Sequence, residues 1–406
     1  MNKLLYYKLH TYIMQLSKRL QNLKPSATIA MSAKARELKS QGIDVISLSI
    51  GEPDFNTPDF IKEAAKKAID ENYSGYPPIA GYADLKETIC KKFKRDNDID
   101  YTPNQVVVST GAKQSIYNVL QAIVDEGTEV IIPTPYWVSY SDIVELSGGT
   151  PVFVEGTLEA DFKITPAQLE AAITDKTRAI IYSSPCNPSG SVYTREELKG
   201  LAEVLAKYPN VIIISDEIYE HIVYGEKNVS IASFPEVYNQ TVTVNGLAKA
   251  FAMTGWRIGF IGAPAWLAKA CETLQGQVTS GATSIAQRAA ITALEADPSS
   301  VQYMVDAFAE RRELMLGWAK EIPTFKVNEP KGAFYLFPDV TATFGNTYNG
   351  VTINNADDLA LYLLEHAQVA VVSGSAFGSK NCMRISYAAS VEELREAMTR
   401  IKNALA

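Results

Sequence analysis

The stretch "TVTVNGLAKAFAMTGWRIGFIGAP", residues 241–264, places a nearly uncharged segment between two runs of β-branched and apolar residues. Its charged residues are Lys249 and Arg257, and small or apolar neighbours surround both of them. An unpartnered lysine in such surroundings is costly to keep charged and usually loses its proton. The stretch therefore predicts either an exposed loop or a lysine that is used in its neutral form, as a nucleophile.

Similar runs recur through the middle of the chain and alternate with helix-period segments. The expected strands are residues 105–110, 129–135, 179–185, 211–217, 241–246 and 258–264, and the expected helices include 113–125 and 195–208. Thr194 is a candidate N-cap for the second helix. This alternation is typical of βαβ units, so we predict an α/β fold with a largely parallel sheet.

The C-terminal part of the chain has a different pattern. A long charged helix over residues 301–322 leads into short strands and a last helix, which Ser390 and Glu393 open as a capping box. We predict a large domain over residues 59–297 and a small domain built from 14–58 and 298–406. Residues 1–13 are expected to be a disordered extension before a start at Met14, without the character of a signal peptide.

Composition excludes several classes of function. Acidic residues outnumber basic ones by 46 to 38 in 406 residues, which argues against nucleic-acid binding. No apolar run reaches the roughly 18 residues that a membrane span needs, so a cytoplasmic protein is expected. Four scattered cysteines and three histidines indicate neither a disulfide framework nor a metal site, and the GxGxxG dinucleotide motif is absent.

Polar and aromatic residues gather where the expected strands end, which is where open α/β sheets bind ligands. Gly111, Ala112 and Lys113 form a turn directly before a helix, a geometry that suits phosphate. Trp137 offers either a stacking surface for a planar ring or ordinary packing. Asn187, in "CNPSG", is either a turn former or a donor to a ligand oxygen.

Asp216 closes the apolar run "VIIISDE" and should lie at the mouth of a buried strand. Burial would raise its pKa unless a cation holds it ionised. Tyr219 follows it closely, whereas Glu217 and Glu220 are expected to face solvent or cap the next segment. Each of these polar and aromatic residues could instead have a purely structural role. Taken together with Lys249, however, they fit one ligand, a phosphorylated, planar, pyridinium-bearing aldehyde. That ligand is pyridoxal phosphate (PLP).

From about Met14 onward the chain resembles the fold-type-I PLP-dependent aminotransferases, specifically the aspartate aminotransferase branch and its bacterial type Ib subgroup. The motifs that carry the resemblance are "KPSAT" (24–28), "GEPDFNTP" (51–58), "YPPIAG" (76–81), "PYWVSY" (135–140), "SPCNPSG" (184–190), "SDEIYEHIVY" (215–224), "KAFAMTGWRIG" (249–259) and "RISYA" (384–388). The resemblance implies the type I fold, with a large domain whose mostly parallel sheet lies between helices, plus a smaller α/β domain.

The resemblance implies a role for each residue around the cofactor ring. Lys249 matches the imine-forming lysine, which also moves the proton between the substrate's α-carbon and the cofactor. Asp216 matches the aspartate paired with the pyridine nitrogen. Tyr219 and Asn187 match the two donors to the ring's phenolate oxygen, and Trp137 matches the stacking aromatic residue.

The resemblance also implies how the phosphate is held. Gly111, Ala112 and Lys113 fall in or beside the phosphate turn, and Arg257 matches the arginine that clamps the phosphate. Tyr76 matches a tyrosine that reaches the phosphate of the neighbouring subunit. The implied assembly is a homodimer with shared active sites.

For the substrate, Arg384 resembles the arginine that binds the α-carboxylate with a bidentate fork, a geometry that lysine cannot reproduce. Gly51 lies where the backbone closes over that carboxylate, and Trp137 and Asn187 also border the substrate. One departure is Ala248, which stands where many relatives have a phosphate-binding serine.

A second departure is that residues 272–287 contain no arginine for the substrate's distal carboxylate. Type Ib relatives use instead a lysine in the phosphate turn and a threonine near the N-terminus. Lys113 and Thr28 match these positions, with Ser26 close by. A dicarboxylic substrate is therefore expected.

The implied activity transfers the amino group of L-aspartate to 2-oxoglutarate, giving oxaloacetate and L-glutamate by a ping-pong mechanism through an imine at Lys249. Alternatives on the same fold are an aromatic, alanine or prephenate aminotransferase and a PLP-dependent C–S β-lyase. A transcription regulator with a PLP-type effector domain is disfavoured, because few residues precede the fold and the net charge is −8.

Overall fold

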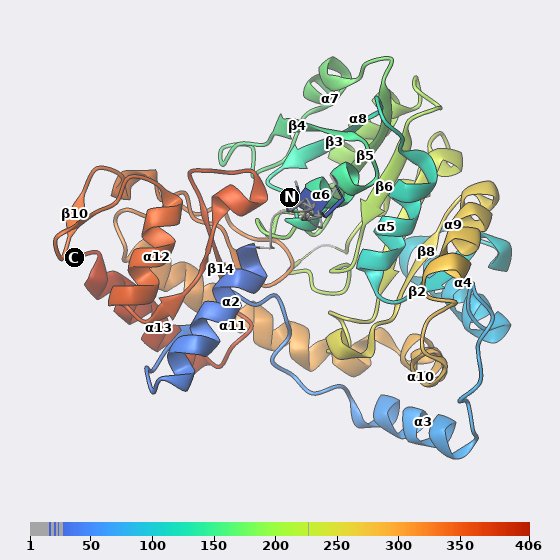
Figure 1. Cartoon of the computed structure of the whole chain (residues 1–406), viewed down its shortest axis with the longest axis horizontal. Coiled ribbons are helices and arrows are strands. Elements are labelled where there is room, and N and C mark those ends of the chain that lie inside the picture. The colour runs from blue at the N-terminus through green and yellow to red at the C-terminus, as the bar shows by residue number, and fades with distance from the viewer. Residues whose placement is uncertain (1–15, 18–19, 22, 24–26, 226) are drawn as a thin grey trace, which may run out of the picture.

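The computed structural model describes residues 16–17, 20–21, 23, 27–225 and 227–406. The expected extension over residues 1–13, its boundary at Met14, and Ser26 lie outside the described residues. Within them the predicted α/β fold is confirmed, because helices flank a central, mostly parallel sheet (Figure 1).

The central sheet contains seven strands. Its spatial order is β2 (Val106–Ser109), β8 (Gly259–Gly262), β7 (Thr241–Gly246), β6 (Ile212–Asp216), β5 (Thr177–Ser183), β3 (Glu129–Thr134) and β4 (Thr150–Glu155). Strands β7, β6, β5, β3 and β4 run parallel, whereas β8 is antiparallel to both of its neighbours. All six expected strands are present, and the carboxyl ends of the parallel strands meet at one edge.

Strand β4 was not predicted, because it lies at the edge of the sheet. Its two end residues are exposed, and one of its six residues is buried. Phe153 is half exposed and stacks on Tyr136 at 5.3 Å between ring centroids. Edge position and partial burial remove the continuous apolar run that marks the inner strands.

Helices cover both faces of the central sheet. The helices of this part of the chain are α3 (Asp59–Asp70), α4 (Ala83–Asn97), α5 (Ala112–Ile123), α6 (Ser139–Leu146), α7 (Pro166–Ala172), α8 (Arg195–Leu205), α9 (Ala265–Val278) and α10 (Ser284–Glu295). Val130 and Ile132 pack with α5, α6 and α9, whereas Ile131 packs with α7 and α8 on the other face, as the alternation of a strand requires. Thr194 caps α8, as predicted.

The C-terminal third forms a smaller layer of strands and helices beside the central sheet (Figure 1). Its elements are α11 (Gln302–Lys320), β9 (Tyr335–Leu336), β10 (Thr347–Tyr348), β11 (Val351–Thr352), α12 (Ala356–His366), β12 (Val369–Ala370), β13 (Val372–Ser373), β14 (Met383–Ser386) and α13 (Val391–Ala404). Ser390 and Glu393 form the predicted capping box of α13.

The N-terminal segment joins this smaller layer. It contributes α2 (Ala27–Ser40) and β1 (Ile46–Ser47), and β1 pairs in parallel with β12. This pairing brings residues near 46 beside residues near 369, although the exact division into two domains stays a prediction. Among the helices of the described ranges, none is long and apolar enough to cross a membrane.

Candidate active site

A cavity of about 320 Å³ opens at the carboxyl ends of the parallel strands. It brings together eleven of the thirteen predicted site residues. These are Thr28, Gly51, Ala112, Lys113, Trp137, Asn187, Asp216, Tyr219, Lys249, Arg257 and Arg384. Gly111 lies against the guanidinium of Arg257, which lines the cavity, whereas Tyr76 does not line the cavity and is 95% exposed.

Lys249 follows β7 by three residues and points into this cavity, so the exposed-loop interpretation is wrong. Burial lowers the pKa of Lys249 to about 8, and the charges of Arg384 and Arg257 act in the same direction. Its Nζ donates a hydrogen bond to the carbonyl oxygen of Gly51 at 2.5 Å. A lysine in these surroundings is easily deprotonated and can act as a nucleophile or a base near neutral pH.

Asp216 is the last residue of β6 and is buried, as predicted. The hydroxyl of Tyr140 donates to its Oδ2 at 2.6 Å, and the backbone N–H of Ile218 donates to Oδ1 at 3.3 Å. Burial nevertheless raises the pKa of Asp216 to about 6. A cationic ring nitrogen bound beside this carboxyl would oppose that rise and keep it ionised.

Tyr140 was missed in the sequence. It lies on α6, is fully buried, and lines the cavity. The signal was present in principle, because a carboxylate at the end of a buried strand needs a donor, and Tyr140 closes the aromatic motif 135–140.

The N-terminus of α5 meets a guanidinium group. Gly111 occupies the N-cap with φ of 83°, and a side chain at this position would collide with the guanidinium of Arg257. Arg257 donates to the carbonyl oxygens of Thr254 at 2.8 Å and Thr110 at 3.3 Å. A cation beside the positive end of a helix is unfavourable by itself, so this corner is built for an anion.

Lys113 adds to the positive charge of this corner. Burial, followed by the charge of Arg257, lowers the pKa of Lys113. Its Nζ lies 4.8 Å from the centroid of the Trp137 ring, which in turn packs edge-on against Tyr140. The Trp137 ring therefore lines a site whose neighbours are cationic.

Arg384 lies on β14 and is fully buried. Its Nη1 donates to Oδ1 of Asn187 at 2.9 Å and its Nη2 to the carbonyl oxygen of Ser49 at 2.6 Å. Its Nε has no hydrogen-bond partner among the described residues. A buried guanidinium without a carboxylate partner indicates a site for an anionic ligand.

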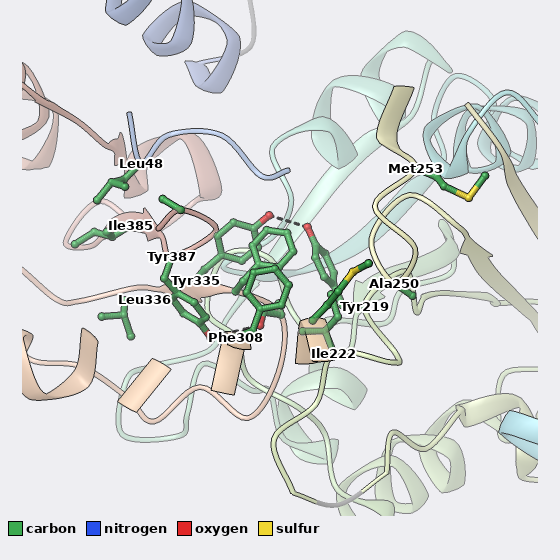
Figure 2. Packing of buried hydrophobic residues seen from close by; sticks show 14 of the residues in the cluster. Leu48, Tyr219, Ile222, Ala250, Met253, Phe308, Tyr335, Leu336, Ile385 and Tyr387 are labelled. Atoms are coloured by element: carbon green, nitrogen blue, oxygen red, sulfur yellow. Dashed lines mark hydrogen bonds between the residues drawn. The ribbon is translucent and has the colours of Figure 1, made fainter. Parts of the chain in front are cut away.

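Tyr335 is the second site residue that the sequence did not reveal. It begins β9, lines the cavity, and its hydroxyl lies 2.7 Å from the hydroxyl of Tyr219 (Figure 2). The same hydroxyl lies against Gly51, so that a side chain at position 51 would collide with it. An aromatic residue in a short apolar strand cannot be distinguished from core by its sequence.

The expectation that Glu217 and Glu220 face solvent is wrong, because both are buried. Glu220 forms an ion pair with Lys92 and accepts a hydrogen bond from Nδ2 of Asn97 at 2.7 Å. Glu217 accepts a hydrogen bond from the hydroxyl of Ser230 at 2.7 Å. Burial and the charge of Glu220 raise the pKa of Glu217 to about 8.

This burial predicts a pH-dependent stability. The folded protein keeps the Glu217 proton up to about pH 8, whereas the unfolded chain releases it near pH 4.5. The folded state therefore binds more protons in this window, and the free energy of unfolding falls as pH rises. The variant Glu217→Gln should lose less stability between about pH 5 and pH 8, by at most roughly 1.4 kcal/mol per pH unit. Urea unfolding of both proteins across this range checks it, and parallel curves would contradict it.

The family model for aminotransferase class I and II matches residues 43–401. The chain belongs to this aminotransferase family. Similar proteins include an aspartate aminotransferase of Geobacillus stearothermophilus, 48% identical over 96% of this chain and 98% of that protein. An aspartate/prephenate aminotransferase of Cereibacter sphaeroides is 48% identical over 95% of this chain and 98% of that protein. The structure of the aspartate aminotransferase from Rhizobium meliloti superposes with a TM-score of 0.94, with 42% identity over 97% of this chain and 99% of that chain.

Aminotransferases of this family depend on PLP, and the cavity fits that cofactor. The anion corner at the start of α5 suits a phosphate, and the buried Asp216 suits a cationic ring nitrogen. Lys249 is shifted toward its neutral form, as carbonyl chemistry requires. The unpartnered Nε of Arg384 leaves a separate anion site for the second reactant.

Proposed function

We propose that this aminotransferase transfers the amino group of L-aspartate to 2-oxoglutarate by a ping-pong cycle, giving oxaloacetate and L-glutamate. The observation that carries the proposal is the charge of the cavity. Among the described residues that line it, Lys113, Lys249, Arg257 and Arg384 are basic and Asp216 alone is acidic, although the whole chain has a net charge of −8. A phosphate and a dicarboxylate would together neutralise this excess.

In this proposal each cofactor-binding residue has a distinct task. The N-terminus of α5 and Arg257 hold the phosphate, Trp137 covers the ring, and Asp216 keeps the ring nitrogen protonated. When bound, PLP supplies an electron sink that stabilises negative charge at the substrate's α-carbon. Lys249 holds the cofactor's aldehyde carbon before the substrate arrives and then moves the α-proton.

In this proposal the two carboxylates of the substrate have different partners. Arg384 binds the α-carboxylate through its planar fork, and Asn187 orients that fork by accepting from Nη1. Lys113 and Thr28 bind the distal carboxylate. The backbone at Gly51 covers the α-carboxylate and keeps water out of the site. Without water, the charge interactions of the two carboxylates are stronger.

We also propose a homodimer, in which Tyr76 reaches the phosphate site of the partner subunit. The nearly complete exposure of Tyr76 supports this role, because a large aromatic side chain is left without cover on this chain. The division into a large domain over residues 59–297 and a small domain from 14–58 and 298–406 belongs to the same proposal.

Replacing Lys113 with alanine is expected to affect aspartate selectively. A lost charged contact corresponds to about a 10- to 100-fold fall in kcat/KM for aspartate. Alanine, which lacks the distal carboxylate, should be used by the variant about as well as by the wild-type enzyme. Steady-state rates with both donors, at saturating cofactor, check this. Equal losses on both donors would contradict the distal-carboxylate role and leave Lys113 as a phosphate residue.

Prephenate is a second candidate acceptor, because the Cereibacter sphaeroides relative is named for both substrates. A panel of amino donors and of the acceptors 2-oxoglutarate, oxaloacetate and prephenate tests the proposed function directly. Aspartate should give the highest kcat/KM among the donors. Higher values for alanine or for an aromatic amino acid would contradict the assignment.

A further inference from the structure

One hydrogen bond in the cavity joins the central sheet to the smaller C-terminal layer. It connects the hydroxyls of Tyr219, which follows β6, and Tyr335, which begins β9, at 2.7 Å (Figure 2). Tyr335 pairs with Ser386 of β14, two residues from Arg384 on the same strand. The bond therefore runs from the strand layer that carries Arg384 to the segment that carries Tyr219.

Either hydroxyl could donate in this hydrogen bond, and the role of Tyr219 decides between them. Burial raises the pKa of both phenols, and the charge of the Arg384 guanidinium opposes this rise at both of them. The guanidinium carbon lies 4.7 Å from the centroid of the Tyr335 ring. A hydroxyl has one proton to donate, so when Tyr219 donates to a ligand in the cavity, Tyr335 is the donor in the bond between them.

We propose that Tyr335 is a positioning residue that couples carboxylate binding at Arg384 to the hydrogen bond that Tyr219 donates to the bound cofactor. This inference rests on the proposed function, because it takes Arg384 as the α-carboxylate site. Hydrogen bonds in a chain strengthen one another, so a donor to Tyr219 makes Tyr219 a stronger donor in turn. When a carboxylate neutralises Arg384, Tyr335 donates less strongly and the contact of Tyr219 weakens.

We call the path from Arg384 through Tyr335 to Tyr219 the relay, and the chain offers a matched control for it. Tyr387 is also fully buried in the same hydrophobic cluster (Figure 2). Its hydroxyl lies 3.2 Å from that of Tyr224. Neither tyrosine of this second pair lines the cavity. The variants Tyr335→Phe and Tyr387→Phe each remove a single buried hydroxyl and keep the ring, so they differ in location and not in chemistry.

The test is a pH titration of the visible absorbance of the cofactor-loaded enzyme, with and without maleate, a dicarboxylate that has no amino group. Tyr219 stabilises the anionic form of the cofactor's ring oxygen, so a weaker contact raises the midpoint of the titration. Tyr335→Phe should raise the midpoint without maleate by roughly 0.3 to 1 pH unit, the value of one hydrogen bond. The further rise that maleate causes should be smaller in this variant than in the wild-type enzyme. Tyr387→Phe should titrate as the wild-type enzyme does.

Two results would overturn the relay. One is a Tyr335→Phe titration that matches the wild-type curve in both conditions, and the other is an equal change in Tyr387→Phe, which would indicate lost packing. Equilibrium dialysis of the cofactor gives a second readout, and Tyr335→Phe alone should bind it more weakly. A wild-type enzyme whose absorbance ignores maleate would instead refute the dicarboxylate site, and the relay with it.

Discussion

Replacing Lys249 with alanine is expected to lower turnover of aspartate by at least about 10⁴-fold, the upper range for the loss of a general acid–base group. The reason is that no other described lysine lines the cavity except Lys113, which lies at the phosphate corner near Trp137. The pKa of about 8 puts a useful fraction of Lys249 in the neutral form near neutral pH. Single-turnover mixing of the loaded variant with aspartate measures the loss directly.

The variant Lys249→Arg separates nucleophilicity from charge. Arginine keeps a cation in the cavity but does not lose its proton in proteins, so it should be as inactive as alanine. Borohydride reduction should attach the cofactor covalently to the wild-type chain at Lys249 and to neither variant. Turnover by Lys249→Arg, or covalent attachment at another residue, would refute the assigned role.

The inner part of the fold could be predicted because burial leaves a direct mark on sequence. Strands β5 and β6 are covered by helices on both faces, so they are continuous apolar runs that end abruptly at polar residues. Asp216 was therefore found from its place at the end of such a run. Lys249 was found in the same way, as a cation in a stretch with no partner.

The parts that could not be predicted depend on partners far away in the chain. Glu220 is buried because Lys92 and Asn97 meet it, and Asn97 lies 123 positions earlier in the sequence. Tyr335 and Tyr219 are 116 positions apart, and nothing local to Tyr335 distinguishes it from a core aromatic residue. Pairings of this kind are set by the tertiary fold, and a single sequence carries no record of them.

The exposure of β4 illustrates a different limit. Its register with β3 is regular from end to end, yet its sequence lacks a continuous apolar run because one side and both ends of the strand meet solvent. Tyr140 was missed because its partner is distant in the sequence: its buried hydroxyl donates to Asp216, which lies 76 positions later. The motif at residues 135–140 indicated an aromatic side chain at Tyr140 but not that its hydrogen-bond partner is Asp216.

Replacing Asp216 with asparagine is expected to lower kcat/KM for aspartate by about 10²- to 10³-fold. Removing one member of a buried, hydrogen-bonded charge pair costs about 2–5 kcal/mol, and the amide cannot keep the cofactor's ring nitrogen protonated. Without that proton the ring withdraws fewer electrons, so the loss should fall mainly on kcat. The amide oxygen still accepts from Tyr140, which keeps the geometry of the site close to that of the wild-type enzyme.

A neighbouring residue supplies the control for this experiment. Glu217→Gln makes the same acid-to-amide change one position along the chain, in a buried carboxyl that does not line the cavity. It should retain wild-type kcat/KM, whereas Asp216→Asn should not. Tyr140→Phe should fall between the two, because losing its hydrogen bond raises the pKa of Asp216 without removing the carboxylate. Equal losses in Asp216→Asn and Glu217→Gln would show that buried charge in this region acts on stability, and that the carboxylate of Asp216 has no special part in the chemistry.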